Sequence, residues 1–166
     1  GNLEQVNNYL LFSAFLLFHY FTNYYIHDYC QNKMIIIRHD NFLNNIECNN
    51  FIEIMESSDK VQKLDSNERY LLPYKNDQIL FKLASLYKVY NFTPMNIDNM
   101  EINRWPSGTE QKPHYDTNDK FAFVIFLNED FSGGETVVDD IILRPKIGRL
   151  ILFNNGITGF KHFFFF

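Results

Sequence analysis

The sequence is poor in cysteine and in positive charge, and each shortage excludes a class of protein. Cys30 and Cys48 are the only cysteines among 166 residues, and no CxxC pair occurs. A disulfide framework or a cysteine-based zinc site is therefore not expected, and both residues are interpreted as ordinary thiols. The formal net charge is −5. Nucleic acid is not expected as a partner, because binding to phosphates requires a basic face.

Apolar runs long enough to cross a membrane are also missing. The apolar run at residues 9–18 is about half of the ~20 residues that a spanning helix needs, and no Lys or Arg precedes Lys33 to mark a secretory signal. We predict that residues 1–33 contain an aromatic-rich helix packed on the domain or on a partner. A membrane anchor over residues 9–26 is the alternative. The compartment stays open, with the cytoplasm favoured.

The sequence does contain enough apolar residues for one hydrophobic core. Hydrophobic residues make up 46% of the chain and aromatic residues 17%, which is typical of a globular domain rather than a disordered chain. We expect this domain to span residues 34–166. The chain ends in four consecutive phenylalanines, 163–166, which fit neither a strand period nor a helix period. This ending suggests a truncated C-terminus.

The hydrophobic period changes from helical to alternating along the chain. After a short strand at 35–37, Asp40 or Asn41 can cap a helix that runs to about residue 57. Residues 58–75 are polar and irregular, and Asn76 or Asp77 can cap a second helix to about residue 87. Helices first and short strands later predict an α+β fold, with a sandwich or jelly roll. The strands are expected at 98–105, 121–127, 137–138, 141–143 and 149–153.

His114 and Asp116 are the residues that indicate chemistry. Residues i and i+2 of a strand point to the same face, so an imidazole and a carboxylate would project together. Two histidines and one carboxylate on one face of a metal leave positions open for substrates, as in non-haem Fe(II) oxygenases. A His-x-Asp alone is a weak signal, and a surface turn is the alternative interpretation.

The surrounding motifs strengthen this hypothesis. Arg104-Trp105 and a glycine precede the HYD of 114–116, an apolar strand ending in LNED follows, and then come FSGGET (131–136), PKIGRLILF (145–153) and His162. In this order they resemble the catalytic core of the prolyl-4-hydroxylase-like 2-oxoglutarate/Fe(II) dioxygenases. The resemblance is densest over 100–162 and extends loosely back to about residue 35.

The resemblance implies a double-stranded β-helix, or jelly roll, supported by N-terminal helices. It implies His114, Asp116 and His162 as iron ligands, with 2-oxoglutarate, O2 and ascorbate as the remaining cofactors. It further implies oxidative decarboxylation of 2-oxoglutarate coupled to hydroxylation, with a prolyl residue of a peptide or protein as substrate.

Two departures from the family pattern bear on activity. Trp105 stands where the family usually has a tyrosine that helps to hold 2-oxoglutarate; its indole N–H can donate one hydrogen bond, or the ring can simply pack. The cation that the family places beyond the last histidine, to pair with the distal carboxylate of 2-oxoglutarate, is absent, as is the closing strand. A catalytically inactive domain used for binding or scaffolding is therefore the alternative function.

Overall fold

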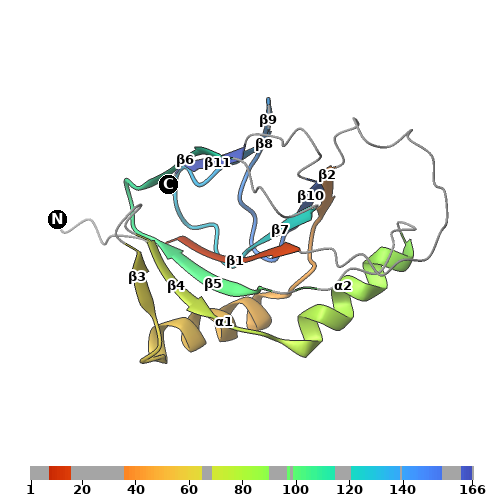
Figure 1. Ribbon diagram of the computed structural model, residues 1–166, viewed down its shortest axis with the longest axis horizontal. Coiled ribbons are helices and arrows are strands. Elements are labelled where there is room, and N and C mark those ends of the chain that lie inside the picture. Colours follow the sequence, from red (N-terminus) through yellow and green to blue (C-terminus); the bar gives the residue numbers. More distant parts are fainter. Residues whose placement is uncertain are drawn as a thin grey trace, which may run out of the picture.

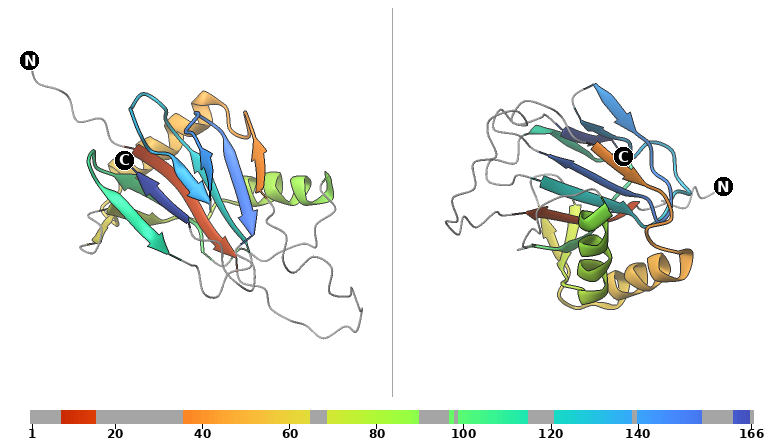
Figure 2. Two further views of the ribbon diagram at one scale, coloured as in Figure 1. Left: turned by 90° about the horizontal axis from the view of Figure 1, so that it is seen from above. Right: turned by 90° about the vertical axis from the view of Figure 1, so that its right-hand side faces the viewer.

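Two antiparallel sheets and two helices make up the part of the chain that the structure describes (Figure 1). The structure is a computed structural model, and it describes residues 8–15, 36–64, 69–89, 97, 99–114, 121–138, 140–154 and 162–165. The smaller sheet lies over one face of the larger one, and both helices lie against the other face (Figures 1 and 2). The prediction of a mixed fold, with helices early and short strands late, is confirmed.

The larger sheet contains seven of the described strands, and all of its neighbouring strands pair antiparallel. Its central strands are built from β-branched and aromatic residues, which favour strands because they pack well on a pleated surface. In spatial order the strands are β2 (Ile36–His39), β10 (Leu150–Asn154), β7 (Phe121–Phe126), β1 (Asn8–Phe15), β5 (Glu101–Trp105), β4 (Arg69–Pro73) and β3 (Gln62–Leu64).

The smaller sheet has the order β6 (Glu110–His114), β11 (His162–Phe165), β8 (Thr136–Val138) and β9 (Ile141–Leu143). Between β5 and β11 the chain passes repeatedly from one sheet to the other. Gly133 and Gly134, at φ of 88° and 73°, form the predicted turn before β8, because glycine adopts positive φ without steric cost.

Both helices begin at asparagine caps. The side chain of Asn44 accepts a hydrogen bond from the backbone N–H of Glu47, and the Glu47 carboxylate accepts one from the Asn44 N–H. This capping box satisfies two backbone donors at the start of α1 (Asn45–Ser57). Asn76 caps α2 (Asp77–Val89) as predicted, through a 3.0 Å bond from the N–H of Ile79.

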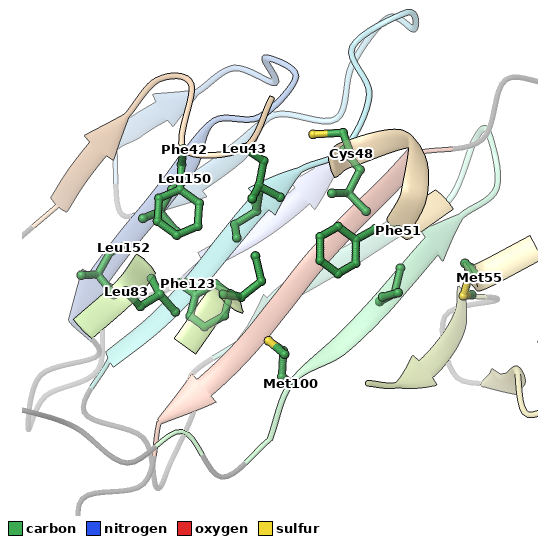
Figure 3. Packing of buried hydrophobic residues seen from close by; sticks show 14 of the residues in the cluster. Phe42, Leu43, Cys48, Phe51, Met55, Leu83, Met100, Phe123, Leu150 and Leu152 are labelled. Atoms are coloured by element: carbon green, nitrogen blue, oxygen red, sulfur yellow. The ribbon is translucent and has the colours of Figure 1, made fainter. Parts of the chain in front are cut away.

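A helix-side cluster fills the space between the larger sheet and the two helices (Figure 3). Burying this apolar surface stabilises the domain at roughly 25 cal/mol per Å². The cluster consists of Ile37, Phe42, Leu43, Cys48, Phe51, Met55, Leu72, Ile79, Leu83, Met100, Ile102, Phe123, Ile125, Leu127, Leu150 and Leu152.

A second cluster lies between the two sheets and is called the inter-sheet cluster below. Alternate residues of β7 contribute to the two clusters, as the twofold period of a strand requires. The inter-sheet cluster consists of Trp105, Ala122, Val124, Phe126, Val138, Leu143, Ile151 and Phe153.

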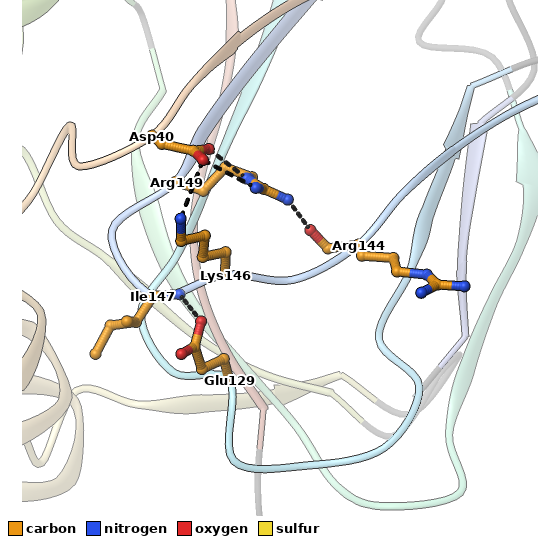
Figure 4. Close-up of polar contacts among 6 residues, drawn as sticks. All are labelled: Asp40, Glu129, Arg144, Lys146, Ile147 and Arg149. Atoms are coloured by element: carbon orange, nitrogen blue, oxygen red, sulfur yellow. Dashed lines mark hydrogen bonds and ion pairs between the residues drawn. The ribbon is translucent and has the colours of Figure 1, made fainter.

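A polar network fixes the turn before β10 to the chain after β2 (Figure 4). The Asp40 carboxylate accepts hydrogen bonds from Arg149 Nε at 2.6 Å, from Arg149 Nη2 at 3.1 Å and from Lys146 Nζ at 3.1 Å. These bonds hold the pKa of Asp40 well below its ordinary value of 3.8. Arg149 is thus committed to a structural ion pair.

The N-terminal prediction requires a correction. A helix was expected in residues 1–33, but Asn8–Phe15 form strand β1 instead, paired with β5 on one side and β7 on the other. Two flanking strands provide hydrogen-bond partners along both edges of β1, and such long-range pairing leaves no trace in the local pattern. The domain boundary predicted at residue 34 lies outside the described residues.

Two further predictions were wrong in detail. Residues 58–75 were expected to be irregular, yet they contain β3 and β4, which pair with each other and, through β4, with β5. The first helix begins at Asn45 rather than after Asp40 or Asn41. Asn41 has a positive φ of 59°, whereas an N-cap residue usually has an extended backbone, as Asn44 has. Phe42 and Leu43 are buried in the helix-side cluster.

Neither described helix combines the length and the apolar character needed to cross a membrane. Most of the candidate anchor at residues 9–26 lies outside the described residues.

Candidate functional site

Strand register brings the two predicted histidine positions side by side in the smaller sheet. His114, the last residue of β6, is the direct Cα partner of His162, the first residue of β11. Position 162 also pairs with Val138 of β8, so positions 114, 162 and 138 form one row across three strands. Directly opposed positions of antiparallel strands share a face of the sheet. Val138 is buried in the inter-sheet cluster, and the row therefore lies on the face toward the larger sheet.

The His114 ring is held in an orientation that suits a metal ligand. Its Nδ1 lies 3.0 Å from the carbonyl oxygen of Lys112, and its Nε2 lies 3.2 Å from Gln111 Nε2. A carbonyl can only accept, so Nδ1 carries the proton and Nε2 presents its lone pair, which accepts from the Gln111 amide. Histidines that bind metals usually donate their other N–H to a carbonyl or a carboxylate in this way. The described donor therefore fits the expected Fe(II).

Of the other two predicted ligands, the structure describes only the backbone of one. Asp116 lies outside the described residues, and for His162 the structure gives the backbone position in β11. Within the described ranges, no three His, Cys, Asp or Glu side chains gather as a metal group. The three-ligand set of His114, Asp116 and His162 thus stays a prediction.

Trp105, the predicted cofactor-binding residue, is the last residue of β5 and is 2% exposed. It belongs to the inter-sheet cluster. The guanidinium carbon of Arg69 lies 5.5 Å from the centre of its ring, within the range of a cation–π contact. Arg69 also forms a loose ion pair with Glu101, at 3.6 Å between Nη1 and Oε1.

Two buried oxygen atoms face the space between the sheets without a hydrogen-bond partner among the described residues. They are Asn103 Oδ1 on β5 and Thr136 Oγ1 on β8. Asn103 shares the face of Trp105 two residues away, and Thr136 shares that of Val138. A buried acceptor without a partner costs free energy, so both positions are candidates for contact with a bound molecule.

The described cysteine has no place in this site. Cys48 lies in the helix-side cluster with no exposed surface, and burial raises the pKa of its thiol to about 11. A thiol with a raised pKa is a poor nucleophile and a poor metal ligand. For Cys48 this agrees with the interpretation as an ordinary thiol.

Arg69 was not among the predicted site residues, because its segment looked irregular. The signal that could have identified it is the run Arg69-Tyr-Leu-Leu-Pro73, a short strand-like stretch ended by proline. Its neighbour Arg104 was noted in the motif, but it contacts Glu56 of α1 at 2.9 Å and the Tyr70 ring. Arg104 therefore lies on the helix side of β5 and outside the site.

Comparison with known proteins identifies a shared fold. No protein-family model matches the chain, and no curated protein does. Among solved structures, the viral collagen prolyl hydroxylase vCPH from Paramecium Bursaria Chlorella virus-1, in a complex with 2-oxoglutarate (2OG), matches with a TM-score of 0.60 at 18% sequence identity. The match covers 81% of this chain and 89% of that chain. The resemblance to the prolyl-4-hydroxylase-like dioxygenases is thus confirmed at the level of the fold.

Proposed function

We propose that this protein is an Fe(II)- and 2-oxoglutarate-dependent hydroxylase that acts on prolyl residues of a peptide or protein. In this proposal the two sheets form a double-stranded β-helix, and His114, Asp116 and His162 hold the iron at one end of the space between them. When bound, iron would supply the oxidising chemistry: 2-oxoglutarate, O2 and a substrate C–H give succinate, CO2 and a C–OH.

One observation carries the proposal: the direct pairing of positions 114 and 162 across β6 and β11. These residues are 48 positions apart in the sequence, and the sequence motif alone assigned them to one metal. A register shifted by one residue would put them on opposite faces of the sheet. The likeness in fold to a protein solved with 2OG adds independent support.

The chain's own residues would prepare the site in three ways. The carbonyl of Lys112 favours the tautomer in which His114 Nε2 carries the lone pair, and a metal would take the place of the Gln111 amide at that atom. The inter-sheet cluster excludes water behind the site, which strengthens polar interactions inside it. Asn103 and Thr136 offer buried polar atoms to a ligand that enters between the sheets.

The test is the release of succinate and CO2 from 2-oxoglutarate by the Fe(II)-loaded protein, with and without proline-containing peptides. We expect turnover by the wild type and loss of at least about 100-fold in His114→Ala, because ligand removal disables metal-dependent chemistry. His39→Ala is the matched control, since His39 is the half-buried histidine of β2 and contacts Phe42. Equal turnover by wild type and His114→Ala would refute the proposal.

A binding domain without catalysis is the second candidate. Trp105 stands where the prolyl-4-hydroxylase-like dioxygenases usually have a tyrosine that helps to hold 2-oxoglutarate, and this departure motivates the second candidate. A protein that binds Mn(II) but neither binds nor converts 2-oxoglutarate would favour this candidate over the hydroxylase.

A further inference from the structure

Arg69 is a partly desolvated cation whose hydrogen bonds are incomplete. Its side chain is 19% exposed, and it comes from β4 onto the sheet face that carries Trp105. Its Nε atom is buried without a hydrogen-bond partner among the described residues. The ion pair with Glu101 spans 3.6 Å, longer than the about 2.7–2.9 Å of a charge-assisted hydrogen bond.

Such an arrangement is costly unless something else completes it. A charge removed from water needs both a counter-charge and hydrogen bonds, and Glu101 provides only the first. Glu101 is also shared, because its Oε1 accepts from Asn103 Nδ2 at 3.1 Å. The planar guanidinium group of an arginine, its fork, has five N–H donors. Arg69 therefore keeps donors for a second, planar anion.

The face around Arg69 also suits a small carboxylate. The strand period and the pairing of β4 with β5 place Arg69, Glu101, Asn103 and Trp105 on the same side of the larger sheet, toward the smaller sheet. The Trp105 ring, which is 2% exposed, packs against one side of this position. Arg104, between Asn103 and Trp105 in sequence, points instead to α1.

We propose that Arg69 and Trp105 form a carboxylate-binding subsite between the sheets, in which the guanidinium fork holds the carboxylate and Glu101 is displaced when the ligand binds. The choice of 2-oxoglutarate as the ligand rests on the proposed function.

The test uses the protein's single tryptophan. Trp105 fluorescence is titrated with 2-oxoglutarate in the full chain, first without metal and then with Mn(II). We expect a saturable change in the wild type and an affinity about tenfold or more weaker in Arg69→Gln, as for loss of a charge-assisted bond. Arg69→Lys keeps the charge but not the fork, and should bind with intermediate affinity.

Two further variants make the test specific. Arg104→Gln removes a neighbouring arginine from the opposite face of β5 and should bind like the wild type. Glu101→Gln removes the competing carboxylate while keeping an acceptor for Asn103, so it should bind several-fold more tightly. This gain can be measured even if Arg69→Gln fails to fold, which circular dichroism would reveal.

The subsite and the proposed function can fail separately. Unchanged affinity in Arg69→Gln, or weaker binding in Glu101→Gln, would overturn the subsite, as would a wild type that does not respond to 2-oxoglutarate. Loss of Mn(II) binding in His114→Ala, measured by calorimetry, would still support the metal site. A wild type that binds 2-oxoglutarate through Arg69 but binds no divalent metal would support the subsite and contradict the hydroxylase.

Discussion

Gly148 is the residue at which the turn before β10 touches the chain after β2. Its carbonyl accepts a 3.1 Å hydrogen bond from the N–H of Leu43, and its own N–H donates a 2.8 Å bond to Phe126. It has a φ of 72°, and a Cβ built on it would overlap the Leu43 carbonyl oxygen. Glycine is therefore required there on two counts, backbone conformation and space.

Replacing Gly148 with alanine should lower the free energy of unfolding by about 3 kcal/mol or more, from left-handed strain and from the overlap. Gly108→Ala is the matched control, because Gly108 also has a positive φ, 81°, but has nothing within 4 Å of the added Cβ. That variant should lose only about 1 kcal/mol. Urea denaturation of both variants measures the difference; equal losses would show that the contact with Leu43 does not constrain this turn.

At the scale of elements, β1 is the strand on which the two halves of the larger sheet depend. It lies between β5 and β7, and its removal would leave both with unpaired backbone edges inside the sheet. A chain that begins at Met34 should therefore lose cooperative thermal unfolding and aggregate, whereas the full chain unfolds in one transition. The measurement is differential scanning calorimetry with light scattering. A cooperative, monomeric shortened chain would mean that β1 is dispensable.

Elements with strong local signals were predictable from the sequence, and those that depend on distant pairing were not. The asparagine before α2, the apolar strand β7 and the glycine turn before β8 can each be recognised from a few adjacent residues, and the structure confirms them. Strands β1, β3 and β4 exist because β5 and β7 offer them partners. The local pattern could not show those partners, so an apolar run was interpreted as a helix and a polar stretch as a loop.

The same division holds for the candidate site. The motif order assigned His114 and His162 to one metal, and their pairing across β6 and β11 is consistent with that assignment. Arg69 was missed because its role depends on β4 lying beside β5, which places it over Trp105. A residue that acts through tertiary position carries no motif of its own.

For the whole molecule, the two faces of the larger sheet have separate roles. The face toward the helices is closed by an apolar cluster and anchors the sheet. The face toward the smaller sheet carries Asn103 and the Arg69–Trp105 pair, and the smaller sheet carries Thr136 and the row with His114 across from them. The buried oxygens of Asn103 and Thr136 have no hydrogen-bond partner among the described residues. Among the described residues, the candidate site therefore lies between the sheets.

The most direct test of the metal assignment is calorimetric titration of Mn(II) into the wild type and into His114→Ala, Asp116→Ala, His162→Ala and His39→Ala. We predict one site in the wild type, affinity at least about 100-fold weaker in each of the first three variants, because each removes one of three protein ligands, and wild-type affinity in His39→Ala. Wild-type affinity in His162→Ala would contradict the account, because the pairing of positions 114 and 162 would then have no part in holding a metal.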